Sequence, residues 1–160
     1  MSLTIALVAI LLISAAAGWL GFSRASRLRA EGRPHSLPIY HGAYAALWAA
    51  LPALLLLAVW APVQSTLVDQ AVLASPEGRA LPSFDMQRQS ILSEAREIAR
   101  GERDSGFNPE SASLAPRFAE TEARYATVGG AVAILLALAA AAFALRRTSS
   151  QFRARTGVER

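Results

Sequence analysis

One apolar stretch, residues 43–63, constrains the fold of this chain more than any other feature. Its 21 residues include no charged side chain. At the helical rise of about 1.5 Å per residue they extend about 31 Å, and the hydrocarbon core of a bilayer is about 30 Å thick. A basic segment precedes this stretch and an acidic segment follows it. Residues 43–63 therefore predict a transmembrane helix that separates two compartments.

Two further apolar stretches, residues 3–22 and 128–145, are also long enough to cross a bilayer as helices. Residues 3–22 could instead be a signal peptide, because Ala15–Ala17 resembles a cleavage site. A signal peptide has positive charge before its apolar core, whereas here the arginines follow it. We therefore expect an all-α membrane protein with three transmembrane helices and a helical, extracytoplasmic segment between the second and third.

The charge of the connecting segments predicts the orientation of the three spans. Residues 23–42 carry a net charge of +3, residues 64–127 one of −3, and residues 146–160 one of +4. Positive segments beside a span stay in the cytoplasm. The prediction is an N-terminus outside, a cytoplasmic loop over 23–42, a periplasmic segment over 64–127 and a cytoplasmic basic tail over 146–160.

Small residues recur at helical spacing in all three spans. The rows are Ser14/Gly18 and Ala17/Gly21 in the first span, Ala45/Ala49/Ala53 in the second, and Gly129/Ala133/Ala137/Ala141 in the third. Such rows let helix backbones approach closely. We expect the spans to pack on one another or on a partner, and a glycine-zipper dimer is the alternative arrangement.

Two prolines lie in the second span. Pro52 is interior and predicts a bend near Trp48, either a hinge or a static bend that fits a neighbouring helix. We expect Pro62 to close the span.

The polar segment 64–127 contains one clear amphipathic helix, predicted over 84–100. Ser83 is the expected N-cap and Gly101 the residue just past the C-terminus. The apolar stripe consists of Phe84, Ile91, Ala95 and Ile98, and Leu92 and Ala99 widen it. The opposite, solvent-facing side consists of Glu94, Arg96, Glu97 and Arg100.

A loop is predicted from Glu102 to Pro116, with a helix restarting at Arg117 and continuing into the third span. One helix and a loop cannot enclose a core alone. The segment must therefore rest on the membrane surface, on the spans or on another domain.

The composition excludes several kinds of chemistry. The chain has no cysteine, so it has neither disulfides nor thiolates. His35 and His41 are the two imidazoles, and an interfacial polar role is favoured for them over metal binding or proton relay. Glu94 and Glu97 alternate with arginines, which favours solvated ion pairs over general acid–base catalysis. We expect no enzyme activity and predict no catalytic, cofactor-binding, metal-binding or substrate-binding residue.

The net charge of +4 does not indicate nucleic-acid binding, because the arginines lie in short segments beside the spans. All sixteen basic residues are arginine. The partner that the sequence itself indicates is the lipid bilayer.

Several motifs, in order, resemble the N-terminal extension of the permease subunit of phosphate-specific ABC transporters, the PstC type of proteobacteria. The motifs are YHGxYxALWAALPALLLL over Tyr40–Leu57, GFNP over Gly106–Pro109, LAPR over Leu114–Arg117, TVGGAV over Thr127–Val132, and Phe152–Arg155 with Val158–Arg160. The resemblance covers nearly the whole chain from Pro38 onward. The core permease helices of that family, with their substrate pathway and ATPase-coupling loop, have no counterpart among these residues.

This resemblance implies an accessory N-terminal membrane module of a phosphate importer permease, with a structural or assembly role and no part in the substrate pathway. It implies a multi-pass protein of the bacterial cell inner membrane. The implied partners are the other permease subunit and the core permease helices, and no ATPase contact is expected.

The alternative is a fragment of a membrane-anchored extracytoplasmic sensor. A sensor should have heptads or a signalling linker after Arg147, and Thr148–Arg160 has neither. An intramembrane enzyme is disfavoured, because the spans lack the ionisable side chains that such chemistry needs.

Overall fold

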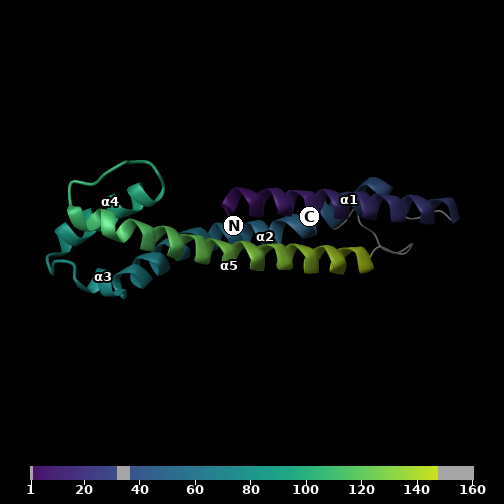
Figure 1. Cartoon of the computed structure of the whole chain (residues 1–160). Helices are drawn as coiled ribbons and strands as arrows, with labels where there is room; N and C mark the ends of the chain where they lie inside the picture. Colours follow the sequence, from purple (N-terminus) through teal and green to yellow (C-terminus); the bar gives the residue numbers. More distant parts are fainter. Residues whose placement is uncertain (1, 32–36, 148–160) are drawn as a thin grey trace. The chain divides into compact units, whose positions relative to one another are not determined.

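The computed structural model describes residues 2–31 and 37–147, which form helices and their connections (Figure 1). The helices are α1 (Leu3–Glu31), α2 (Pro38–Leu73), α3 (Pro76–Arg79), α4 (Asp85–Ala99) and α5 (Pro109–Arg147). No strand occurs in these residues, and α1, α2 and α5 are each long and apolar enough to cross a membrane. The predicted all-α class with three candidate spans is confirmed. His35, part of the predicted loop 23–42, the tail from 148 onward and the motifs at Phe152–Arg155 and Val158–Arg160 lie outside the described residues.

Contacts divide the described chain into two units, to which α2 and α5 both contribute. The span unit comprises residues 2–58 and 129–147, and the head unit comprises residues 59–128. Each unit has its own packing.

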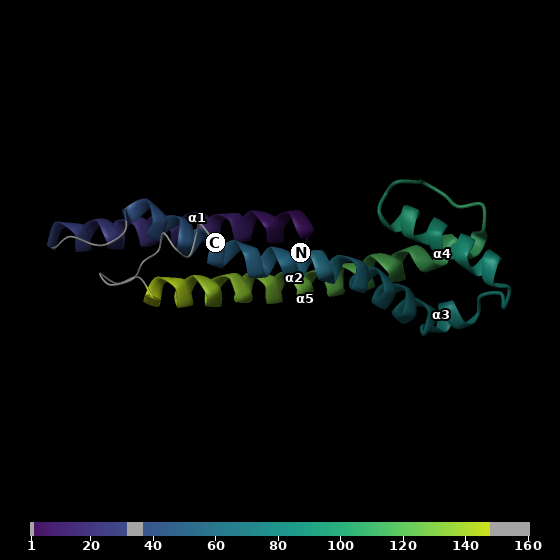
Figure 2. The ribbon, with the colours of Figure 1, turned by 180° about the vertical axis from the view of Figure 1, so that it is seen from behind.

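The span unit packs α1, the first part of α2 and the last part of α5 side by side (Figures 1 and 2). Most of its buried positions are small residues, and the predicted rows supply many of them: Ala17, Ala45, Ala49, Ala53, Ala133, Ala137 and Ala141. Large apolar side chains such as Leu12, Leu55 and Leu135 are exposed instead. This distribution is the one expected of helices that pack in lipid, where close backbone approach replaces the hydrophobic effect. The predicted packing of the spans on one another is confirmed.

Glycines bring α1 and α2 into backbone contact. A Cβ atom on Gly21 would lie 2.8 Å from the carbonyl oxygen of His41, and one on Gly42 would lie 2.9 Å from that of Gly18. Carbon and oxygen atoms do not approach so closely without repulsion, so only glycine fits at these two positions.

Helix α2 continues well beyond the proline that was expected to close it, and it ends at Leu73. Proline removes one donor from the helix, but its fixed φ is itself helical, so a long helix can pass through it. The hydroxyls of Ser65 and Thr66 donate hydrogen bonds to the Pro62 carbonyl oxygen, at 2.9 and 3.4 Å. The continuation carries α2 into the head unit.

The core of the head unit comes from α2, α4, α5 and the connection after α3. Its buried members are Val68, Val72, Leu81, Ile91, Leu92, Ala95, Leu114 and Phe118. Helix α4 therefore rests on the continuations of α2 and α5, which are the supports that it needs to bury its apolar stripe.

The stripe predicted for α4 is correct at Ile91 and Ala95 and wrong at Phe84, whose side chain is 65% exposed. Phe84 is the N-cap, with extended backbone, so its side chain leaves the helical face. The expected N-cap at Ser83 is wrong for the same reason, because the helix starts one residue later. Gly101 has φ +71°, which confirms it as the left-handed residue after the helix.

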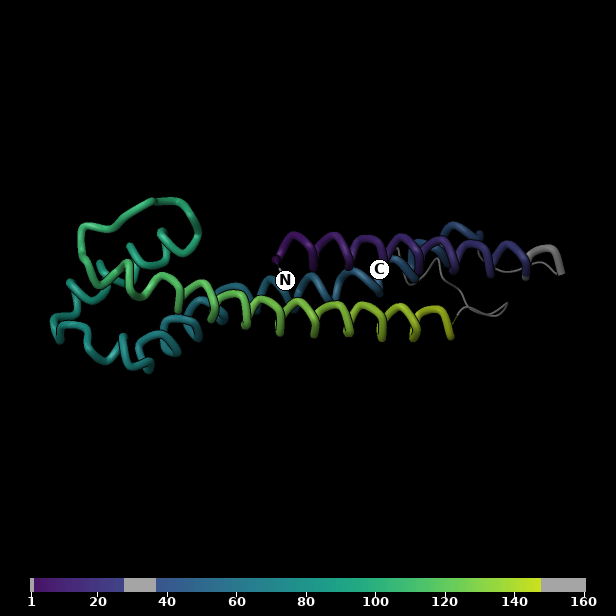
Figure 3. The backbone as a smooth tube through the Cα atoms, viewed as in Figure 1, coloured from purple at the N-terminus to yellow at the C-terminus, as the bar shows by residue number. Residues whose placement is uncertain are grey.

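Helix α5 begins at Pro109, eight residues before the predicted restart at Arg117, and runs without interruption to Arg147 (Figure 3). Pro109 occupies the first helical position, where a missing N–H costs nothing. Pro116 lies inside the helix and is exposed. The predicted loop from Glu102 to Pro116 is therefore correct up to Asn108 and wrong from Pro109 onward, because a single proline inside a helix removes only one hydrogen bond.

Candidate functional site: the loop between α4 and α5

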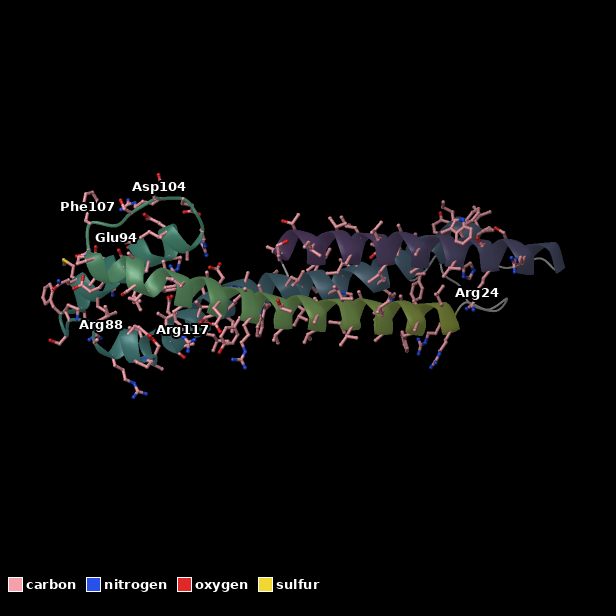
Figure 4. All side chains as sticks on the ribbon, viewed as in Figure 1. Arg24, Arg88, Glu94, Asp104, Phe107 and Arg117 are labelled. Atoms are coloured by element: carbon pink, nitrogen blue, oxygen red, sulfur yellow. The ribbon has the colours of Figure 1, made fainter. Side chains whose placement is uncertain are left out.

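A buried carboxylate holds the loop that joins α4 to α5. The Glu94 side chain of α4 is only 7% exposed. Its Oε2 accepts a hydrogen bond from the Asn108 backbone N–H at 3.1 Å, and its Oε1 accepts one from Asn108 Nδ2 at 3.1 Å (Figure 4). The placement of Glu94 on the solvent-facing side of the helix is therefore wrong.

Gly106 and Ser111 complete this arrangement, which we call the Glu94 clasp (Glu94, Gly106, Asn108 and Ser111). Ser111 donates to the Asn108 carbonyl oxygen at 2.6 Å. A Cβ atom on Gly106 would lie 2.6 Å from Glu94 Oε2 and 2.1 Å from Ser111 Oγ. A side chain at position 106 would therefore displace the carboxylate from its place.

The hydrogen bond from the Asn108 backbone is the main cause that lowers the pKa of the Glu94 carboxyl, and it outweighs the opposing effect of desolvation. The Asn108 and Ser111 side chains and the nearby Arg103 charge lower the pKa further. The clasp therefore holds Glu94 in its ionised form. A carboxylate that is engaged in this way is poorly suited to take up a proton from a substrate at neutral pH.

The same loop displays an aromatic ring. Phe107 is 90% exposed, and the Arg103 guanidinium carbon lies 5.6 Å from its ring centroid. Arg103 Nε also pairs with Glu97 Oε2 of α4, at 3.1 Å. The clasp fixes the backbone on one side of Phe107 and Arg103 lies against its ring, so the loop presents this side chain to the surroundings (Figure 4).

Two ion pairs on successive turns of α4 connect it to the other long helices. Arg96 pairs with Asp69 of α2 and also lies over the Phe118 ring, 5.6 Å from its centroid. Arg100 Nη2 donates to Glu122 Oε1 of α5 at 2.9 Å. Glu122 raises the pKa of Arg100, so this arginine keeps its charge. Helix α4 thus ties α2 to α5 within the head unit.

The site offers a fixed loop and an exposed ring, and no assembled metal site accompanies it. Within residues 2–27 and 37–147, no three His, Asp or Glu side chains lie close enough together to hold a metal ion. Glu97, the other member of the carboxylate pair considered above, binds Arg103. This arrangement can hold the loop in place and present the Phe107 ring as a contact surface.

Sequence reasoning missed the clasp, although the motif Gly106–Pro109 contains a signal for it. Asparagine followed by proline is a typical start of a helix, with asparagine as N-cap and proline at the first helical position. Recognising that start would have placed the beginning of α5 correctly. It would not have identified Glu94 as the partner, because that contact joins residues 14 positions apart.

Three helices long and apolar enough to cross a membrane, together with a small helical head unit, are the features of a multi-span helical membrane protein. Residues 7–160 match the family described as phosphate ATP-binding cassette transporter, and the chain belongs to this family. The link to phosphate transport is therefore confirmed. No curated protein and no solved structure matches the chain.

Proposed function

We propose that this chain is the accessory N-terminal membrane module of a phosphate importer permease of the PstC type, and that it serves assembly of the transporter and not conduction. Family membership over residues 7–160 supports the phosphate part of this proposal. The proposal includes the bacterial inner membrane as location, and it assigns the chain no catalytic role.

The observation that carries the structural role is the chemistry of the span interior. Residues 3–22, 43–63 and 128–145 contain no charged side chain. The buried positions of the span unit are mostly alanine. Phosphate is an anion, and pores for anions are lined by cationic side chains or by oriented donors. The spans described here are therefore suited to packing and unsuited to passing phosphate.

The head unit supports the same role. Its core and its two inter-helix ion pairs hold α2 and α5 outside the apolar stretches, and the Glu94 clasp displays Phe107. A fixed surface of this kind suits contact with another subunit. We propose that the other permease subunit and the core permease helices are the partners, without contact to the ATPase.

The orientation remains as proposed from the charges, with an outside N-terminus and cytoplasmic basic ends. One contact supports it: Arg24 of α1 donates to the Leu145 carbonyl oxygen of α5 at 3.1 Å, so the basic ends of both helices share one end of the span unit. The chain has no cysteine, so single cysteines test the orientation cleanly. A Ser26→Cys variant should react with an impermeant thiol reagent only from the cytoplasm, and a Ser105→Cys variant only from outside.

Deletion of the chain from the transporter tests the assembly role. We expect the amount of complete transporter in the membrane, measured on native gels, to fall several-fold while transcript levels stay constant. A variant with Phe107→Ala is the matched partial change, because it removes the exposed ring and leaves the head core intact. An unchanged amount of assembled transporter after the deletion would contradict the assembly role.

A further inference from the structure

Four arginines gather at one end of the span unit. Arg24 Nη1 donates to the Leu145 carbonyl oxygen at 3.1 Å, which places the turn of α1 around Arg24 against the last turn of α5 (Figure 4). Arg146 and Arg147 follow Leu145 directly, and Arg27 lies one helical turn after Arg24. The fold thus joins cationic side chains that are more than a hundred residues apart in the sequence.

These arginines are exposed, and no carboxylate among residues 2–27 and 37–147, whose side chains the structure describes, pairs with any of the four. In the head unit, carboxylates pair with five of the seven arginines, namely Arg88, Arg96, Arg100, Arg103 and Arg117. The four guanidinium groups at the end of the span unit therefore keep most of their donors for an anion from outside the protein.

Aromatic side chains indicate the depth at which these arginines lie. The Arg147 guanidinium carbon is 4.8 Å from the ring centroid of Phe143, and the Phe143 ring lies 5.6 Å from that of Trp48. On α1, Trp19 and Phe22 are exposed within the two turns before Arg24. Aromatic belts mark the headgroup level of a bilayer. The arginines lie just beyond that belt on both helices, at the level of lipid phosphates.

We infer that Arg24, Arg27, Arg146 and Arg147 form a binding site for the phosphate group of an anionic phospholipid. The guanidinium fork matches phosphate oxygens in a bidentate geometry. Basic clusters between transmembrane helices at the membrane surface bind anionic headgroups for this reason. Inorganic phosphate has the same chemistry, but the position beside the aromatic belt favours the lipid. The inference is independent of the proposed assembly role.

The test measures how strongly the full chain prefers an anionic lipid. The chain is reconstituted in phosphatidylcholine vesicles with a trace of spin-labelled phosphatidylglycerol or spin-labelled phosphatidylcholine, and the immobilised fraction gives relative association constants. Each basic residue near a charged surface contributes a factor of about five. We expect a preference for phosphatidylglycerol of about fivefold or more, and its loss in a variant with Arg24→Gln, Arg146→Gln and Arg147→Gln.

Two further variants keep the test decisive if the triple variant misfolds. Arg146→Gln with Arg147→Gln leaves the Arg24 contact intact and should lower the preference, because two of the four cationic side chains are lost. Arg79→Gln with Arg124→Gln changes the same number of exposed arginines in the head unit and should leave the preference unchanged. Equal association of both lipids with the unsubstituted chain, or an equal loss in the head-unit variant, would overturn the inference.

Inorganic phosphate forms the last arm of the experiment. Phosphate and sulfate are added to the same vesicles at matched ionic strength. We expect both to weaken the preference for phosphatidylglycerol equally, through screening alone. Selective release of the spin-labelled lipid by phosphate would assign the site to the free anion and would overturn the assignment to lipid.

Discussion

The span unit and the head unit share two helices, α2 and α5, but pack them in opposite ways. In the span unit, α2 buries Ala45, Ala49 and Ala53, whereas in the head unit the same helix buries Val68 and Val72. Lipid removes the hydrophobic driving force between helices, so small residues and close backbones hold the spans together. In water, burial of large apolar side chains stabilises the fold instead. Along one helix, the buried residues change from alanine to valine where its surroundings change from lipid to water.

The two units also differ in how they use their arginines. The head unit pairs five of its seven arginines with carboxylates, for example Arg96 with Asp69 and Arg100 with Glu122. The exposed arginines at the end of the span unit bind no carboxylate among the described residues and face outward. Ion pairs therefore contribute to the fold of the head, whereas the arginines of the span unit are available for contacts with its surroundings.

The largest effect in this comparison is expected from Phe118→Ala in the head core. Phe118 is fully buried, and truncation of a buried phenylalanine costs about 3–5 kcal/mol. Amide hydrogen exchange of α4 should accelerate strongly, because its apolar face loses its main support. Phe143→Ala in the span unit is the control, since that ring is 43% exposed. Equal acceleration in α4 by both variants would contradict separate packing of the two units.

Gly21→Val should have the next largest effect, in the span unit. Its first side-chain atom would lie 2.8 Å from the His41 carbonyl oxygen, so α1 and α2 must separate. Overpacking of this kind costs about 1–3 kcal/mol. The thermal midpoint of the reconstituted chain should fall, whereas Ala16→Val, at an exposed position of the same helix, should leave it nearly unchanged. Similar midpoints for both variants would argue against close packing of α1 on α2.

Glu94→Gln should loosen the loop of the head unit in a pH-dependent way. The pKa of Glu94 is lowered in the folded protein, so its stabilising effect is present above the unfolded pKa and disappears as the pH falls through the folded pKa. Cleavage of the loop by a protease should therefore be faster in the variant near neutral pH, and the difference should vanish in acid. Glu102→Gln, in the same loop and exposed, is the control. A difference that persists unchanged in acid would exclude the carboxylate as the cause.

The smallest effect is expected from the ion pair between Arg100 and Glu122. Both side chains are partly exposed, and pairs of this kind contribute about 0.2–1 kcal/mol. A double-mutant cycle with Arg100→Gln and Glu122→Gln should give a coupling energy in this range that decreases with salt. The same cycle on Arg117 and Glu120 is the control, because both residues lie in α5. Substitution of this pair should leave the contact of α4 with α5 unaffected. A coupling energy near zero at low salt would show that this ion pair does not stabilise the head unit.

The sequence predicts the span unit better than the head unit, and the reason is physical. Burial of small residues such as Ala49 and Ala137 follows from local spacing, because one helix face must meet another. Glu94 gives no such local signal. It lies between arginines on a polar helix, and only a partner 14 residues away makes its burial favourable. Pro116 misleads for a related reason, since its single missing hydrogen bond is small beside the packing of Leu114 and Phe118.

Phosphate uptake per assembled transporter separates a role in assembly from a role in conduction. In the proposed function this chain supports assembly, and phosphate passes through other helices. Uptake of labelled phosphate is measured in cells with and without the chain and is divided by the amount of complete transporter in the membrane. After deletion of the chain, we expect a lower total uptake and an unchanged uptake per assembled transporter. A fall in uptake per transporter at an unchanged amount of transporter would contradict the proposed function and would place the chain in the transport path.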